Sequence, residues 1–323
     1  LGNALVDTEI EVSEKNLSDL GIEKGLMTLV DEERQHFLQD SLSDHLVMSK
    51  RACGGSAANT VISLSQFGGK GFLSCKVADD ENGRFYMQDL MDNGVDHNTD
   101  AQITQGITGK CLVMITDDAD RTMNTFLGIS SDLASADVDA SAVENSEYLY
   151  IEGYLVTGES SLNAVLEACK IARQAGTKIA LSLSDPGIVE YFRDGLKSIV
   201  GDGVDLLFCN EQEALSWCQT DSLDQALEQL QNSATQFAVT LGSEGAVVFD
   251  GSDYLRAAAQ PVTAIDTNGA GDMFAGAYLY GITQGYSCLA SAVFANRAAS
   301  AVVSQYGPRL HSAEYDIIKE GLQ

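Results

Sequence analysis

The chain has 323 residues, 45% of them hydrophobic, which is enough to bury one large α/β core or a core with a smaller domain. Its 47 acidic and 19 basic residues give a formal net charge of −28, and such a field repels nucleic acids and anionic membranes, which bind clustered Lys and Arg. The sequence contains no uninterrupted apolar run of about 18 residues, so we expect no membrane-spanning helix and no membrane or nucleic-acid partner.

The seven cysteines and four histidines are scattered along the sequence. No C-x-x-C pair occurs, and most cysteines stand in apolar runs, so we expect buried free thiols in a reducing, cytoplasmic compartment. The histidines lack metal-ligand spacing, which argues against structural zinc. The chain opens on Leu1 rather than Met, so a short leading segment is expected to be missing.

The first fifty residues carry short β-like segments. Gly2, Asn3 and Asp7 belong to the end of an expected strand, and polar and apolar residues then alternate through residue 12, as in a half-exposed strand. Residues 24–30 and 45–49 are further expected strands, and Asp31 is placed to cap a helix between them. Short strands bunched in this way predict a small sheet that stands apart from the main one.

A glycine-rich turn follows, with the sequence CGGSAAN at residues 53–59, and it opens a helix predicted to reach residue 67. A Gly-Gly-Ser turn before a helix is often only a loop with an N-cap. The alternative is a turn whose backbone approaches a small polar ligand, with Asn59 projecting from the second helical turn. Residues 72–77 form the next expected strand, and the acidic residues 79–81 are expected to begin a solvated helix rather than to bind a metal.

A second pair of strands is expected over residues 109–116 and 122–127, joined by a polar hairpin turn. These strands would complete the small sheet begun before residue 53. Arg121 lies at the hairpin, where it would either reach a transferred phosphate or remain a solvated turn residue.

From residue 148 onward, apolar strands alternate with amphipathic helices. Strands are expected over residues 148–151, 178–183 and 206–209, and helices over 160–175 and 187–199. This alternation predicts a mostly parallel sheet with helices on both faces, which binds ligands at the carboxyl ends of its strands. Asn210 and Glu213 follow one such end and would share a helix face.

The last third contains two weaker signals. Residues 237–248 indicate a strand, a turn and a strand; the turn region contains Thr240, Gly242 and Gly245, and its simplest interpretation is a glycine hairpin. A helix expected over residues 289–304 carries Asn296 among small residues. The sequence lacks G-x-x-x-x-G-K-[ST] and a G-x-G-x-x-G in the dinucleotide-binding context, which argues against a P-loop NTPase and a dinucleotide dehydrogenase.

The most informative stretch is DTNGAGD at residues 266–272, which runs into the apolar segment MFAGAYL. It predicts a tight glycine turn that feeds the first turn of a helix, where unpaired N–H groups and the helix dipole favour an anion. Asp272 is then either an acid stabilised by the dipole or a general base beside an anion hole made by Gly269, Ala270 and Gly271.

This stretch resembles the second signature of the ribokinase-like (PfkB) carbohydrate kinase family, in which the last Asp is the catalytic base and the Gly-Ala-Gly amides form the anion hole. Residues 54–59, GGSAAN, are similar to the first signature of the same family, and the two occur in the expected order. The resemblance implies that the sugar hydroxyls are held by Asn3, Asp7, Gly54, Gly55, Ser56 and Asn59.

The resemblance also implies the remaining ligands. ATP would be bordered by Thr240, Gly242 and Gly245, with Asn210 and Asn296 nearby. Mg²⁺ is implied at the ATP phosphates, with Glu213 acting through water. A monovalent cation such as K⁺ is implied near Asp266 and the loop around Gly307.

Several segments look more like the adenosine kinase branch of the family than like ribokinase or fructokinase. They are residues 2–3, 54–60, 150–154 and 181–184. In that branch Tyr154 would stack on a purine and Cys111 would line the pocket, the alternative for both residues being packing in the lid or core.

We therefore expect an α/β, ribokinase-like fold with a mostly parallel central sheet, helices on both faces and a small β-rich lid. The core would comprise residues 1–7, 54–104 and 129–323, and the lid residues 8–53 and 105–128. The expected activity is ATP-dependent phosphorylation of a primary hydroxyl, on a ribonucleoside such as adenosine or on a sugar. The alternatives are a free-sugar kinase and a catalytically silent nucleoside- or sugar-binding sensor. We expect a monomer or a homodimer formed through the lid.

Overall fold

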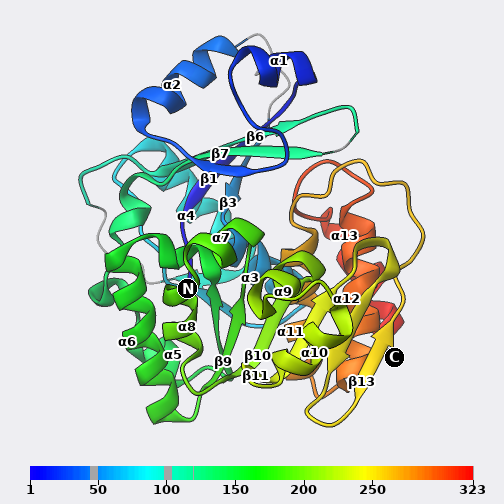
Figure 1. Ribbon diagram of the computed structural model, residues 1–323. Coiled ribbons are helices and arrows are strands. Elements are labelled where there is room, and N and C mark those ends of the chain that lie inside the picture. Colours follow the sequence, from blue (N-terminus) through cyan, green and yellow to red (C-terminus); the bar gives the residue numbers. More distant parts are fainter. Residues whose placement is uncertain (44–49, 98–103, 119, 323) are drawn as a thin grey trace.

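The computed structural model describes residues 1–43, 50–97, 104–118 and 120–322, which form two large sheets and a two-stranded one. Figure 1 shows the five-stranded sheet at one end of the molecule, with α1 (Glu14–Asp19) and α2 (Glu32–Ser41) beyond it, and the six-stranded sheet at the other. The predicted small sheet is therefore present, while residues 45–49, over which a further strand is expected, lie outside the described residues.

The five-stranded sheet joins segments that are distant in the sequence. Its spatial order is β2 (Met27–Leu29), β7 (Arg121–Phe126), β6 (Gly109–Ile115), β1 (Leu5–Glu11) and β3 (Lys50–Gly54). β1 runs parallel to β6 and antiparallel to β3, and β6 and β7 form the predicted antiparallel hairpin. One face of the sheet packs against α1 and α2 through a cluster that includes Ile10, Leu38 and Met114.

The six-stranded sheet is the predicted, mostly parallel one. Its spatial order is β13 (Tyr254–Ala257), β12 (Ala246–Phe249), β11 (Ala234–Thr240), β10 (Val204–Asn210), β9 (Lys178–Ser182) and β8 (Tyr148–Glu152). β8 to β11 are parallel, and β12 and β13 are added antiparallel at one edge. The two-stranded sheet pairs β4 (Gly71–Leu73) with β5 (Val95–His97).

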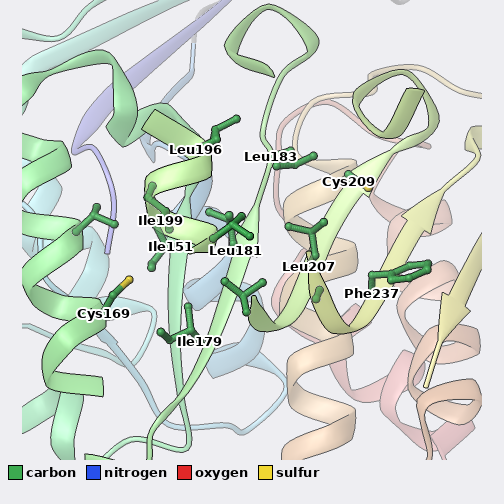
Figure 2. Close-up of a cluster of buried hydrophobic side chains, with 14 of the residues drawn as sticks. Ile151, Cys169, Ile179, Leu181, Leu183, Leu196, Ile199, Leu207, Cys209 and Phe237 are labelled. Carbon is green, nitrogen blue, oxygen red and sulfur yellow. The ribbon is translucent and has the colours of Figure 1, made fainter. Parts of the chain in front are cut away.

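Helices cover both faces of the six-stranded sheet. One face packs against α6 (Glu159–Ala175), α7 (Pro186–Tyr191), α8 (Arg193–Val200), α9 (Glu211–Cys218) and α10 (Leu223–Leu230). The other packs against α11 (Ala270–Thr283), α12 (Cys288–Val302) and α13 (Ser312–Lys319). Figure 2 shows Leu181 and Leu207 of the strands together with Ile199 of α8. Burial on both faces explains why these strands are almost continuously apolar.

Three further α-helices lie between β3 and β8 in the sequence. They are α3 (Ser56–Gln66), α4 (Glu81–Asp92) and α5 (Ala140–Glu144). α3 follows β3 of the five-stranded sheet directly, and it packs against α11 and β8 of the other half. The turn at residues 53–56 is therefore held at the junction of the two halves.

Three predicted elements differ from the structure. The helix expected over residues 187–199 is broken at Phe192, whose φ of −118° and ψ of 24° leave the helical region while its side chain packs on the core. The strand expected over residues 24–30 is shortened to β2, since Gly25 has a φ of 80° that extended strands do not adopt. The strand expected over residues 72–77 is confined to β4.

The composition predicts free, buried thiols and no membrane-spanning helix. All seven cysteines are free thiols, and five of them are buried. Within the described ranges, no helix has both the length and the apolar character required to cross a bilayer.

Candidate active site

A cavity of about 600 Å³ lies between the two large sheets. The five-stranded sheet contributes side chains at alternate positions, as one face of a pleated sheet does: Leu5 and Asp7, Met27 and Leu29, Cys111, and Arg121, Met123 and Thr125. The six-stranded sheet contributes residues at or near the carboxyl ends of its strands, among them Glu152, Ser182, Asn210 and Thr240. The cavity thus coincides with the ligand position predicted for a parallel sheet.

The glycine turn at residues 53–56 borders the cavity at the end of β3. Gly55 is the N-cap of α3 with a φ of 92°, a backbone conformation that L side chains rarely adopt, and a Cβ there would collide with the carbonyl oxygen of Asn3. A Cβ on Gly54 would collide with the Asp7 carboxylate. The two glycines therefore allow the turn to close over β1, which brings it against Asn3 and Asp7.

The turn at residues 267–271 feeds α11, as predicted. Gly269 is the N-cap with a φ of 69°, and a Cβ there would overlap Pro308. At Gly271 a Cβ would meet no atom within 4 Å, so this position borders open space in the cavity. The N–H of Ala270 makes only a 3.4 Å hydrogen bond to the carbonyl of Thr267, and the N–H groups of Gly271 and Asp272 belong to the first helical turn, where they lack an intrahelical acceptor. The turn can therefore receive an anion.

The two glycine turns meet at Asp272. Ser56 Oγ donates to Oδ1 of Asp272 at 2.6 Å, and Asn59 Nδ2 donates to Oδ2 at 3.3 Å. Burial raises the pKa of Asp272 to about 6, and these two hydrogen bonds act against that rise. The carboxylate is thus mostly ionised at neutral pH but close enough to its pKa to accept a proton, as a general base must.

Glu152, at the end of β8, is a site residue that the sequence reasoning missed. Its Oε1 accepts hydrogen bonds from N and Nδ2 of Asn3 at 2.7 and 2.8 Å, and its Oε2 accepts one from N of Ala57 at 2.8 Å. Burial raises its pKa to about 7 in spite of these bonds. Glu152 therefore ties Asn3 to the first turn of α3. The available signal was an acid directly after the apolar strand predicted over residues 148–151.

Further predicted substrate residues line the same cavity. Asp7 is 6% exposed, and burial, with a contribution from Glu9, raises its pKa to about 7. Burial also raises the pKa of the Cys111 thiol, which is therefore neutral and accepts a hydrogen bond from Thr125 at 3.3 Å. The Tyr154 hydroxyl donates to the carbonyl of Ser184 at 3.3 Å.

Asn210 and Glu213 form a reciprocal cap at the start of α9. Asn210 Oδ1 accepts from N of Glu213 at 2.8 Å, and the Glu213 carboxylate accepts from Nδ2 and N of Asn210 at 2.6 and 3.0 Å. Both residues line the cavity, and burial raises the pKa of Glu213 to about 8. Asn210 and Glu213 therefore lie together at the first turn of α9, and each side chain is held by the other residue.

The residues predicted to border ATP divide into two groups. Thr240 and Gly242 line the cavity, whereas Gly245 and Asn296 do not. Gly245 lies against the backbone of Ala257, and Asn296 Nδ2 donates to the carbonyl of Ala257 at 2.7 Å. Both residues of the second group therefore contact the end of β13.

Arg121 is buried, contrary to the interpretation as a solvated turn residue. Its side chain is 7% exposed, and its Nε and Nη2 contact Oδ1 of Asp266, which is fully buried. Nη2 also lies 3.6 Å from Oε1 of Glu9. Asp266 accepts further hydrogen bonds from N of Asn268 at 2.9 Å and N of Gly307 at 2.7 Å. Arg121 lines the cavity, and its Nη1 has no hydrogen-bond partner among the described residues.

The comparisons with known proteins agree with this geometry. Residues 24–314 match the pfkB family carbohydrate kinase. The chain belongs to the pfkB family of carbohydrate kinases. The adenosine kinase from Sinorhizobium meliloti is 34% identical, with a TM-score of 0.93 over 99% of this chain and 97% of that one. The probable sugar kinase from Rhizobium etli CFN 42 is also 34% identical, with a TM-score of 0.93 over 100% of this chain and 97% of that one.

A curated relative extends the same result. The adenosine kinase from Saccharomyces cerevisiae is 26% identical over 99% of this chain and 98% of that protein. This pfkB kinase is therefore a phosphotransferase of the adenosine kinase-like branch, with the predicted ribokinase-like fold, and it phosphorylates a sugar or nucleoside with ATP. The expected enzyme class is confirmed, which decides against the silent sensor.

A pfkB kinase uses ATP, typically with Mg²⁺, and the residues of the cavity fit that ion. In the part of the chain that the structure describes, no group of three or more His, Cys, Asp or Glu side chains could hold a metal on its own. Mg²⁺ keeps several of its waters and binds through substrate phosphates and one or two carboxylates, so it needs no protein cage. Glu213 and Asp272 are carboxylates that line the cavity.

The monovalent cation implied near Asp266 does not fit the side chains there. The Asp266 carboxylate already contacts the guanidinium of Arg121. A K⁺ ion bound beside it would lie about 4 Å from that positive charge, and two unit charges at this separation repel by about 4 kcal/mol near a protein surface. The positive charge beside Asp266 is thus carried by the side chain of Arg121.

Proposed function

We propose that this pfkB kinase transfers the γ-phosphoryl group of ATP to the 5′-hydroxyl of a ribonucleoside such as adenosine. The observation that carries the proposal is the position of Asp272, which lies at the N-terminus of α11 and is held by Ser56 and Asn59 of α3. A carboxylate there can reach an acceptor hydroxyl beside one turn and a phosphoryl group beside the other. The likeness to the Sinorhizobium meliloti adenosine kinase supports this assignment.

Asn3, Asp7 and Gly55 would hold the ribose ring. An ionised Asp7 can accept hydrogen bonds from two neighbouring hydroxyls, and such charge-assisted bonds are stronger than neutral ones. The weaker of the two bonds to Asp272, the 3.3 Å bond from Asn59, would give way to the acceptor hydroxyl. The substrate would then be fixed at its sugar, with its primary hydroxyl against the base.

In the transfer step, Asp272 takes the proton of the hydroxyl as the hydroxyl oxygen bonds to the γ-phosphorus. The bond between that phosphorus and the bridging oxygen breaks, and ADP leaves with the electron pair. The N–H groups of Ala270, Gly271 and Asp272 stabilise the charge on the phosphoryl oxygens. Arg121 would contribute Nη1, a buried donor that lacks a hydrogen-bond partner among the described residues.

ATP would lie over the ends of β10 and β11, beside Asn210, Thr240 and Gly242. Gly245 and Asn296 would not touch ATP themselves. Both contact the backbone of Ala257, and they would support the ATP-binding part of the cavity through it. Mg²⁺, when bound, neutralises phosphate charge, and Glu213 would hold it through water.

A nucleoside is favoured over a free sugar because one wall of the cavity is apolar. Met27, Leu29, Met123 and Leu127 line it, together with the ring of Tyr154. A purine base can bury against such a wall, whereas a free sugar would leave it exposed to water. Cys111 adds a small neutral group to the same face.

The test is a panel of acceptors, with ATP, ADP and phosphorylated product separated by chromatography. Adenosine, inosine, ribose and fructose are each supplied with ATP and Mg²⁺. We expect kcat/KM for a purine nucleoside to exceed that for either free sugar by roughly 100-fold, since the base adds buried apolar contact. A preference for fructose or ribose would instead establish the free-sugar kinase and refute the argument from the apolar wall.

We also propose that residues 8–53 and 105–128 act as a lid over a core of residues 1–7, 54–104 and 129–323. The proposal is supported by the side chains that β2, β6 and β7 direct into the cavity, which are mostly apolar and include the charged Arg121. A lid that excludes water suppresses hydrolysis of ATP, because water competes with the acceptor hydroxyl. The free, mostly buried thiols suit a reducing compartment, so we place the enzyme in the cytoplasm.

A further inference from the structure

The contact between Arg121 and Asp266 joins two regions that are 145 residues apart in the sequence. Arg121 begins β7 of the five-stranded sheet, and Asp266 precedes the turn at residues 267–271. Both side chains are buried, with exposed fractions of 7% and 0%. Breaking such a pair by removing one partner leaves an uncompensated buried charge, so the two groups depend on each other.

Asp266 organises the backbone around the candidate anion hole. Its Oδ1 accepts from N of Asn268, at the start of the turn, and its Oδ2 accepts from N of Gly307 in the loop after α12. The same loop places Pro308 against Gly269, the N-cap of α11. The Asp266 side chain therefore fixes both the turn and the loop that supports it.

The charges around Asp266 explain why a cation is needed there. Glu9 is a second carboxylate near Arg121, and Oε1 of Glu9 accepts a 3.5 Å hydrogen bond from Nδ2 of Asn268. Arg121 is the cation that contacts both acids among the described residues. Without it, the buried Asp266 and the partly buried Glu9 would lie near the turn with no cation between them.

We propose that Arg121 is a tethered cation that replaces a bound monovalent cation at Asp266, and that phosphoryl transfer by this chain therefore needs no added K⁺. Arg121 acts here as a positioning residue, because its guanidinium contacts the Asp266 carboxylate and Asp266 holds the anion-hole turn. This role uses Nε and Nη2, so it is compatible with a phosphate contact through Nη1. The inference rests on the proposed transfer at Asp272.

The first experiment compares the unchanged enzyme in KCl, NaCl and choline chloride at equal ionic strength. ADP formation is followed by chromatography, which avoids coupling enzymes that themselves need K⁺, and the midpoint of thermal unfolding is measured in parallel. We expect kcat to agree within about twofold among the three salts and the unfolding midpoint to be the same, since no site is left for K⁺ to bind. A rate or unfolding midpoint that rises specifically with K⁺ would overturn the inference.

The second experiment uses Arg121→Met, which removes the charge, and Arg121→Lys, which keeps it. In choline chloride, Arg121→Met should lose roughly 100-fold in kcat through displacement of the turn, with the acceptor KM changed much less. Adding K⁺ should restore about tenfold of that loss and raise the unfolding midpoint, because a cation can now bind Asp266. Arg121→Lys should retain more activity and show a weaker K⁺ response.

A matched control is Arg309→Met, which removes another mostly buried arginine, the partner of Asp89 at 2.8 Å. This variant should be destabilised without responding to K⁺, because it leaves Arg121 and Asp266 paired. A K⁺-insensitive loss in Arg121→Met would show that Arg121 acts on phosphate alone and would contradict the positioning role. If the unchanged enzyme phosphorylates no acceptor, the proposed function fails, while the unfolding midpoints in the three salts still decide the cation question.

Discussion

The two large sheets contribute to the cavity in different ways. The five-stranded sheet presents a face, so that Asp7, Arg121 and Thr125 point into the cavity at alternate positions of their strands. The six-stranded sheet presents strand ends, so that Asn210 and Thr240 line the cavity where β10 and β11 end. Each sheet therefore offers a different kind of ligand contact.

The difference follows from how each sheet is covered. Helices bury both faces of the six-stranded sheet, so polar groups can reach a ligand only where its strands end. The five-stranded sheet has its apolar cluster on one face, against α1 and α2, and its other face is free to carry charged groups. We infer that the strand ends hold the nucleotide and that the face, with the turn at residues 53–56, holds the acceptor. The following variants test that division.

The largest effect is expected for Asp272→Ala, at the point where the two halves meet. Loss of the general base should lower kcat by roughly 10²–10⁴-fold while the KM values for acceptor and ATP change much less. Steady-state kinetics with both substrates varied would measure this. Asp316→Asn, at an exposed position on α13, is the control and should behave as the unchanged enzyme. Near-normal turnover in Asp272→Ala would remove Asp272 from the mechanism.

Asp7→Asn tests the face of the five-stranded sheet. Hydrogen bonds to a charged group contribute about 1.5–3 kcal/mol, so the acceptor KM should rise roughly 10–100-fold while the KM for ATP stays within about twofold. Glu11→Gln, at the exposed end of the same strand, is the control. An equal rise in both KM values would contradict the assignment of this face to the acceptor.

The same substitution has a predicted pH dependence of stability. Burial raises the pKa of Asp7 from 3.8 to about 7, so the folded state binds more protons than the unfolded state between these values. The free energy of unfolding therefore falls as pH rises from about 4 to about 7. Above pH 7 the folded protein bears the full cost of keeping an ionised carboxylate buried at Asp7. Asp7→Asn lacks this cost and should be more stable than the unchanged protein at pH 8, by a few kcal/mol (about 1.4 per pKa unit), but not at pH 4. Urea unfolding at both pH values measures it, and an equal difference at pH 4 and pH 8 would refute the assigned pKa.

Gly271→Ala tests the anion hole between the two sheets. A Cβ there would meet no protein atom within 4 Å, so the free energy of unfolding should not fall, but the Cβ would enter the space assigned to the phosphoryl group. Steric intrusion of this size costs about 1–3 kcal/mol, so we expect a loss of roughly tenfold in kcat/KM. Gly269→Ala is the contrast, because its φ of 69° and its contact with Pro308 should make that variant less stable. Full activity in Gly271→Ala would place the phosphoryl group elsewhere.

The smallest effect is expected for Thr240→Val, at a strand end. Loss of one neutral hydrogen bond should raise the KM for ATP about 3–10-fold and leave the acceptor KM unchanged. Thr235→Val, at an exposed position of the same strand, is the matched control. A change confined to the acceptor KM would invert the proposed division between strand ends and sheet face.

The sequence by itself determined the features that depend on neighbouring residues. The turn before α11 needs glycine at the positive φ of Gly269, and Asp31 and Asn210 cap their helices through residues three positions away. Apolar runs separated by amphipathic helices were sufficient to predict the parallel sheet and the edge at which ligands bind. These interactions are local, so the order of residues specifies them directly.

Only the tertiary structure decided which distant residues meet. Ser56 was predicted as a substrate ligand, yet it donates to Asp272, 216 residues later in the chain. The sequence around Arg121 is compatible with a phosphate contact or a solvated turn, and the structure buries this side chain against Asp266. Glu152 received no role, although it joins Asn3 to α3. Each contact depends on how the two sheets face one another, and no local pattern of residues encodes that arrangement.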